Sequence, residues 1–195
     1  KEMEDKILNS ADRLIDLEKK LFLEFRLNLL KYLVPFQKIS KIIGALDVFY
    51  SFAVLGTSNK YVVPKFVESD NPILKIKNLR HPIVEFKTGS KYVPNDIDLT
   101  EKTLVLLTGP NMSGKSTYIR SIAIVVIMAQ MGCVVPAEDC VLSLVDKVFT
   151  RIGASDNLAT GESTFMVEMN ETANILNNAT KNSLVVLDEV GRGTS

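Results

Sequence analysis

The first part of the chain alternates apolar and polar residues with a helical period. Between residues 3 and 34 the apolar positions recur every three or four residues, at Ile7, Ala11, Leu14, Leu17, Leu21, Phe25, Leu29 and Tyr32. This spacing predicts a helix, and the Val34-Pro35 step predicts where it ends, because the residue before proline avoids helical geometry. A second helical pattern covers residues 36–53, with Gly56 as its expected C-cap. We expect the two helices to pack antiparallel.

The pattern changes after Tyr61, where prolines alternate with β-branched residues. This sequence pattern predicts short strands and loops, including strands at Ile73–Ile76 and Pro82–Phe86. His81, the single histidine, precedes a proline, and we interpret it as a turn or capping residue rather than a catalytic one. The expected domains are therefore a partial helical segment, residues 1–56, and a second partial domain, residues 57–195. Periodicity leaves open whether the first is an ordinary helical subdomain or a lever that connects distant parts of a larger protein.

Strands and helices alternate along the rest of the chain. The predicted strands cover residues 103–108, 141–145, 147–152 and 184–187, and the predicted helices cover residues 115–131 and 163–179. The four apolar residues from Leu184 to Leu187 suit a strand that is buried on both faces. Alternating strands and helices of this kind predict a parallel α/β sheet.

A glycine-rich loop lies between the first of these strands and the helix that follows it. The segment GPNMSGKST fits the phosphate-loop pattern G-x-x-x-x-G-K-[ST] and comprises Gly109, Pro110, Asn111, Met112, Ser113, Gly114, Lys115, Ser116 and Thr117. Its glycines let the backbone wrap an anion, and successive N–H groups backed by a helix N-terminus attract negative charge. Lys115 would neutralise the β- and γ-phosphates, and the Ser116 hydroxyl would complete a magnesium shell. The alternative is an ordinary glycine turn before a helix.

Two adjacent carboxylates, Asp188 and Glu189, follow the last predicted strand. Unpaired charges at the end of a buried strand are not core packing, because burying them would be costly. Next to a phosphate loop, Asp188 would hold magnesium through water, and Glu189 would orient and deprotonate the attacking water. The two carboxylates therefore predict that the site hydrolyses the bound phosphate compound as well as binding it.

Composition limits the other functional classes. The chain has 195 residues, 46% hydrophobic and 24% charged, and its net charge is zero, so there is no basic footprint for nucleic acid. Cys133 and Cys140 are too few for a disulfide framework and match no zinc spacing, and we interpret both as core residues of a cytosolic protein. The longest uninterrupted apolar segment, Ile122–Met128, is too short to span a bilayer. We expect a fragment of a longer protein, because the chain starts inside a helical pattern and stops soon after the carboxylate pair.

Five segments carry a family resemblance. They are RHPIVE (80–85), YVPND (92–96), TGPNMSGKSTYIR (108–120), FTRIGASDNLATGESTFMVEMNETANIL (149–176) and LDEVGRGTS (187–195). Together they resemble the MutS family of DNA mismatch-repair ATPases over essentially the whole chain. The resemblance implies an α/β P-loop NTPase with an ABC-type ATPase-like mixed sheet, truncated after the carboxylate pair and preceded by an all-α two-helix lever segment.

The resemblance also implies roles for individual residues. Lys115 and its loop correspond to the family's ATP triphosphate cradle, Ser116 and Asp188 to its Mg²⁺ site, and Glu189 to its catalytic carboxylate. Tyr92 stands where the family usually has phenylalanine stacked on the adenine, and a tyrosine can also stack.

Ser163 falls in the family's signature loop, which reaches across a dimer to the partner's γ-phosphate. Its position after a glycine and before a helix fits this role, because a helix N-terminus with a hydroxyl attracts an anion. From the residues alone, Ser163 would be a helix N-cap.

The function that the resemblance implies is ATP binding and hydrolysis, coupled to mismatched-DNA binding and clamp movement. The expected partners are mismatched double-stranded DNA, contacted mostly outside this fragment, a homo- or heterodimer partner and a downstream mismatch-repair ATPase, with no membrane. The location would be the bacterial cytoplasm, or the nucleus in a eukaryote. Three alternatives stay open: a recombination clamp that does not read mismatches, an ABC-type transporter ATPase, whose Leu-Ser-Gly-Gly-Gln signature is not found, and a fragment that binds nucleotide without turnover.

Overall fold

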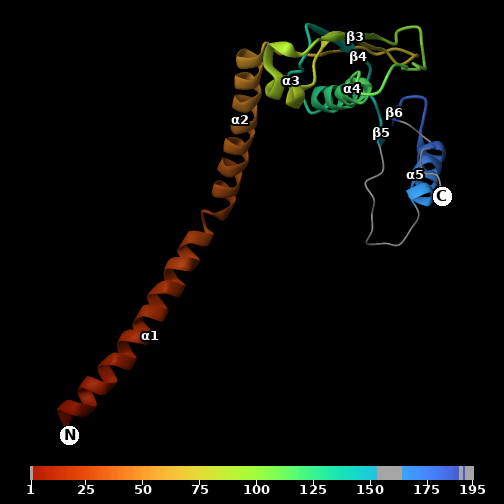
Figure 1. Cartoon of the computed structure of the whole chain (residues 1–195). Helices are drawn as coiled ribbons and strands as arrows, with labels where there is room; N and C mark the ends of the chain where they lie inside the picture. Colours follow the sequence, from red (N-terminus) through yellow and green to blue (C-terminus); the bar gives the residue numbers. More distant parts are fainter. Residues whose placement is uncertain (1, 153–163, 189–190, 192–195) are drawn as a thin grey trace. The chain divides into compact units, whose positions relative to one another are not determined.

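The computed structural model describes residues 2–152, 164–188 and 191 (Figure 1). The chain divides into two compact units, Lys1–Ser51 and Phe52–Ser195. Glu189 and Ser163, two of the predicted site residues, lie outside the described residues. The predicted Asp188 and the whole phosphate loop lie within them.

The first unit consists of the two predicted helices. Helix α1 spans Glu2–Leu30, and helix α2 spans Leu33–Asn59 and continues into the second unit. The break between them comes before Pro35, which lies in the first turn of α2, where proline is tolerated. The expected antiparallel packing is wrong, because every side chain described from residue 10 to residue 51 is exposed.

Within the described chain, α2 is also the one helix that is long and apolar enough to cross a membrane. The longest uninterrupted apolar run did not reveal it, because Lys38, Lys41 and Asp47 interrupt its apolar residues. Length and composition alone are weak support for a membrane span, since core helices of soluble proteins pass the same test.

Helix α2 ends at Asn59, three residues beyond the expected C-cap Gly56. Lys60 adopts a left-handed conformation with φ of 54°, and the Tyr61 N–H donates to the Gly56 carbonyl over 3.2 Å. This backbone pattern is a Schellman cap, in which Lys60 rather than Gly56 takes the left-handed position. The prediction of Gly56 as C-cap is therefore wrong. A Cβ at Gly56 would lie 3.5 Å from the Val134 side chain, an ordinary van der Waals distance.

A mixed four-stranded sheet forms the centre of the second unit. Its strands are β1 (Lys65–Phe66), β2 (Leu74–Leu79), β3 (Asn95–Asp98) and β4 (Asp139–Leu142), in the order β1-β4-β2-β3. β1 pairs parallel with β4, and β2 pairs antiparallel with both β3 and β4. The predicted strand at Ile73–Ile76 is thus confirmed within β2.

Helix α4 (Lys115–Gln130) contributes the other half of the core. Its buried residues Ile122, Val125, Val126 and Ala129 belong to the same apolar cluster as Ile76, Leu79 and Leu142 of the sheet. Cys140 belongs to this cluster and Cys133 is also buried, and both thiols are free, as predicted for core cysteines.

The segment predicted as a strand at Pro82–Phe86 is a helix. Helix α3 spans Pro82–Thr88 and leads into a 3-10 turn, Gly89–Lys91. Pro82 occupies the first turn, where its missing N–H has no helical partner to lose. His81 caps the helix, because its Nδ1 accepts from the Val84 N–H over 3.4 Å. The interpretation of His81 as a capping residue is confirmed.

A second, two-stranded sheet lies near the C-terminal end of the chain. β5 (Val148–Ile152) pairs parallel with β6 (Leu184–Asp188), and α5 (Thr164–Asn178) connects to β6. β6 is buried on one face only, because Val185 and Leu187 are exposed, so the prediction of a strand buried on both faces is wrong.

The predicted strand at residues 103–108 is also absent from the described structure. Leu104 and Leu106 are 82% and 85% exposed, and no described strand pairs with this segment. Apolar residues show that a segment can be buried, but a strand also needs a neighbouring backbone to pair with. Of the predicted parallel sheet, the described residues contain the pairs β5–β6 and β1–β4.

Candidate nucleotide-binding site

The phosphate loop has the backbone path that its glycines permit. Gly109 has φ of 154° and Gly114 has φ of 93°, and Gly114 directly precedes helix α4. A Cβ at Gly109 would lie 3.3 Å from the Ser113 Oγ, which is tighter than most real contacts. Any other residue at either position would be strained, since side chains disfavour positive φ. The loop therefore leaves a space that a side chain would otherwise fill.

Lys115 carries the positive charge of this loop. Its Nζ donates to the carbonyl oxygens of Gly109 and Pro110, over 2.8 and 2.7 Å. The ammonium group thus lies against the loop, at the N-terminus of α4, where the helix dipole adds to its charge. A phosphate group bound there would meet a cation and free N–H groups together, and this fits the predicted triphosphate cradle.

An open pocket of about 680 Å³ adjoins the loop. Its lining combines residues from α3, from the segment that leads into β3, and from the loop and α4, namely Val84, Thr88, Lys91, Tyr92, Val93, Asn95, Asp96, Leu107, Thr108, Ser113, Gly114, Lys115, Thr117 and Tyr118. The pocket therefore brings together Tyr92 and Lys115, two residues predicted from segments that lie more than twenty positions apart. Pockets of this size with a few charged groups are typical of small-molecule sites.

Tyr92 lies at one wall of the pocket. Its backbone N–H donates to the Gly89 carbonyl over 3.1 Å, which fixes the turn after α3. Burial raises the pKa of the Tyr92 phenol, while a hydrogen bond with the His81 backbone acts in the opposite direction. A planar ring at the pocket wall can stack on a base.

Tyr118 is a site residue that the sequence did not reveal. It lies in the first turn of α4, lines the pocket, and donates from its hydroxyl to the Asp96 carbonyl over 2.8 Å. This bond ties the phosphate-loop helix to the start of β3. Burial raises the pKa of the Tyr118 phenol, and the nearby Asp96 carboxylate raises it further. The sole sequence signal was an aromatic residue three positions after Lys115.

The predicted magnesium ligands lie on two elements that contact each other. Ser116 is in the first turn of α4, and Asp188 ends β6, where it pairs with Ile152 of β5. Helix α4 contacts both β5 and β6. Among the described residues, no cluster of three or more His, Cys, Asp or Glu could hold a metal. A hydroxyl, one carboxylate and phosphate oxygens fit Mg²⁺, which usually keeps several waters and few protein ligands.

A phosphate loop at the N-terminus of α4 beside an open, partly aromatic pocket defines a candidate nucleotide-binding protein. Comparison with known families agrees with the sequence, because residues 105–195 match the family model described as MutS domain V. The chain belongs to the MutS family of DNA mismatch repair proteins.

Curated relatives resemble the chain over its whole length. A DNA mismatch repair protein MutS from Geobacillus sp. is 52% identical over 197 residues, which cover 100% of this chain and 23% of the relative. Those from Caldicellulosiruptor bescii and Caldanaerobacter subterraneus subsp. tengcongensis are each 50% identical, again over 100% of this chain, and over 23% and 22% of the relative. The chain therefore spans less than a quarter of the length of these relatives.

Proposed function

We propose that this chain is the nucleotide-binding part of a MutS-type mismatch repair protein, and that it binds ATP with Mg²⁺. The observation that carries this proposal is the pairing of a glycine loop, closed over the Lys115 ammonium, with a pocket that also contains Tyr92. The triphosphate would lie along the loop, and the base would stack on Tyr92. The loop thus supplies positive charge for the triphosphate, and Tyr92 supplies an aromatic ring for the base.

Hydrolysis is the second part of the proposal. Asp188 and Ser116 would hold Mg²⁺, which neutralises charge on the phosphates when it is bound. Glu189 would accept the proton of the attacking water, and Ser163 of a second subunit would complete the site. A site shared between two subunits gives turnover that depends on the dimer.

The third part concerns the whole protein. The relatives carry the name DNA mismatch repair protein MutS. Because the net charge of this chain is zero and gives no sign of DNA binding, the proposed DNA contacts lie in the remaining length of the protein. We propose that the nucleotide bound to this part alters the affinity of the whole protein for mismatched DNA. The proposed location is the bacterial cytoplasm.

Steady-state ATP turnover, measured in the whole natural protein that contains this chain, tests the proposal. Glu189→Gln should lower kcat at least about 100-fold and leave ATP affinity nearly unchanged, because it removes a base and keeps the shape. The control is Glu171→Gln, an exposed carboxylate on α5. Equal loss in both variants, or none in either, would contradict the assignment of Glu189.

A further inference from the structure

Arg80 lies between the nucleotide pocket and the end of helix α2. It follows β2 and precedes α3, and its backbone N–H donates to the Pro136 carbonyl over 2.8 Å, which anchors its main chain. Its side chain is only 17% exposed. A guanidinium group held in this way can bind groups on two sides at once, because its donors are arranged in a rigid fork.

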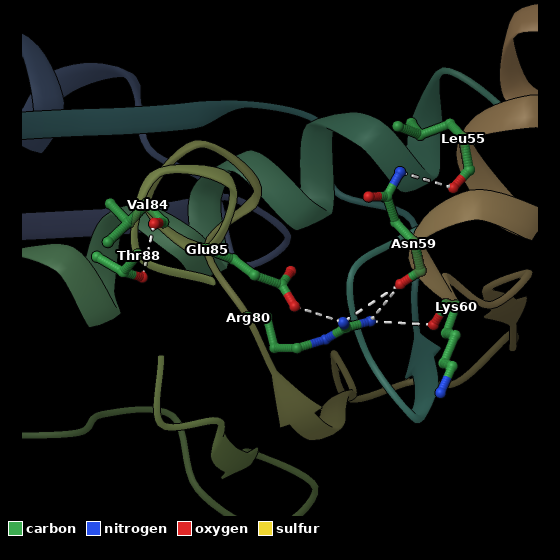
Figure 2. A network of polar contacts seen from close by, with 7 residues as sticks. All are labelled: Leu55, Asn59, Lys60, Arg80, Val84, Glu85 and Thr88. Atoms are coloured by element: carbon green, nitrogen blue, oxygen red, sulfur yellow. Dashed lines mark hydrogen bonds and ion pairs between the residues drawn. The ribbon is translucent and has the colours of Figure 1, made fainter. Parts of the chain in front are cut away.

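One side of the fork binds the end of α2. Arg80 Nη1 and Nη2 both donate to the Asn59 carbonyl over 3.3 Å, and Nη2 donates to the Lys60 carbonyl over 3.0 Å (Figure 2). These carbonyls lie beyond the last helical bond of α2, so they need partners from elsewhere. The guanidinium also lies 5.3 Å from the centre of the Tyr61 ring. Arg80 therefore caps α2 with charge of the sign that a helix C-terminus favours.

The same guanidinium also binds α3, through the Nη1 that it shares with the end of α2. Arg80 Nη1 donates to Glu85 Oε1 over 2.6 Å, and the Glu85 side chain is only 25% exposed (Figure 2). The neighbouring Val84 and the Thr88 of the next turn line the nucleotide pocket. Thr88 Oγ1 donates to the Val84 carbonyl over 2.8 Å, so both pocket residues belong to one bonded turn. A displacement of the pocket wall would therefore move Glu85 as well.

The residue next to Arg80 fixes the same helix at its start. The His81 Nδ1 accepts from the Val84 N–H over 3.4 Å and so caps α3. The first turn of α3 is therefore held by His81 at Val84 and by Arg80 at Glu85.

We propose that Arg80 is a positioning residue that couples the nucleotide pocket to the C-terminal end of α2. A nucleotide that contacts Val84, Thr88 and Tyr92 fixes α3, and Glu85 and Arg80 carry this restraint to the last turn of α2. The inference rests on the proposed nucleotide binding. Because coupling between two sites is reciprocal, ordering the end of α2 also tightens nucleotide binding.

Hydrogen exchange of the full chain, with and without a non-hydrolysable ATP analogue and Mg²⁺, tests this proposal. In the wild type, the analogue should slow exchange several-fold at two places: the first turns of α4, and the amides of residues 57–61 at the end of α2. Arg80→Lys keeps the charge and loses the fork, so the analogue should protect α4 and no longer protect residues 57–61.

Glu85→Gln separates coupling from folding. It leaves the Arg80 cap on α2 and breaks the charged link to α3, so residues 57–61 should be as protected as in the wild type without nucleotide, and should gain little when it is added. Lys75→Gln is the matched control, because it removes an exposed ion pair on β2 and leaves both responses unchanged.

The possible outcomes separate this inference from the proposed function. Failure of the wild type to bind the analogue would overturn the nucleotide site itself. Analogue binding that protects α4 and leaves residues 57–61 unchanged would overturn the role of Arg80 alone. A full response of residues 57–61 in Glu85→Gln would overturn the route through α3.

Discussion

Arg151 of β5 and Glu168 of α5 form a buried ion pair, with 3.8 Å between Nη2 and Oε2 and with only 7% and 2% of the two side chains exposed. Glu168 Oε1 also accepts a hydrogen bond from the backbone N–H of Gly191, which lies beyond β6. Arg151 Nε lies 3.1 Å from Glu171 Oε2 but is not aligned for a hydrogen bond with it. Glu168 of α5 thus contacts both Arg151 of β5 and the backbone of Gly191.

Glu168→Gln should destabilise the chain strongly. The variant keeps the size of the side chain and removes the buried negative charge, so Arg151 loses its buried partner. Breaking a buried pair in this way costs about 3 kcal/mol. Urea unfolding measures the change. Glu171→Gln is the control and should cost less than about 1 kcal/mol, because Glu171 is half-exposed. Equal costs in the two variants would show that burial of Glu168 does not matter.

Gly114→Ala should weaken the phosphate loop through backbone strain alone. A Cβ at Gly114 would meet nothing within 4 Å, so its cost comes from the φ of 93°. Left-handed geometry costs a non-glycine residue about 1–2 kcal/mol. Thermal unfolding measures this loss, and ATP binding should weaken as the loop shifts.

Gly44→Ala is the matched control for this substitution. Gly44 also has open space around it but lies inside helix α2 without positive φ. Alanine there should increase stability by about 0.5–1 kcal/mol, because alanine favours a helix more than glycine does. The same sign in both variants would contradict the backbone explanation.

Asp98 should add to the loss of stability in acid. Hydrogen bonds from Thr100, followed by the contact with Lys75, lower the pKa of Asp98 from 3.8 to about 2. Its carboxylate therefore stabilises the fold above about pH 4, and this contribution disappears as the pH falls towards about 2. Asp98→Asn should show a smaller change of unfolding free energy across that range. Thr100→Val should raise the pKa of Asp98 in an NMR titration, and an unchanged pKa would contradict the assigned cause.

Cys140 should react slowly with thiol reagents in the folded chain. Burial, together with the charge of the neighbouring Asp139, raises the pKa of the Cys140 thiol to about 11. At pH 8 the reactive thiolate is then much rarer than in the unfolded chain, where the pKa is near 8.5. Iodoacetamide should label the native protein at least about 10-fold more slowly than the urea-unfolded protein. Equal rates would contradict burial of this thiol.

Much of the fold was predictable where periodicity and burial agree. Helix α4, for example, has buried residues at helical spacing directly after the glycine loop. Helix α3 was missed because its apolar and β-branched residues favour a strand, whereas His81 and Pro82 start a helix. The strand at residues 103–108 was predicted from apolar character alone, which does not supply a pairing partner.

The candidate site was predictable in its motifs and less so in its connections. Gly109–Thr117 and Tyr92 were found by pattern and resemblance, and the structure places residues of both at one pocket. Arg80, Tyr118 and Glu168 were missed because each acts through a contact with a distant segment. Sequence spacing gives no sign of such a contact until the fold brings the partners together.

Isothermal titration of the chain with ATP and Mg²⁺, in the wild type and in Lys115→Ala, tests the central claim most directly. A charged hydrogen bond to phosphate contributes about 1.5–3 kcal/mol, so the variant should bind about 10- to 100-fold more weakly. Lys102→Ala, which removes a lysine of the exposed segment before the loop, should bind as the wild type does. Saturable binding by the wild type that falls in Lys115→Ala alone is the predicted result. Absence of binding by the wild type, or equal affinity in all three proteins, would contradict a nucleotide site at this loop.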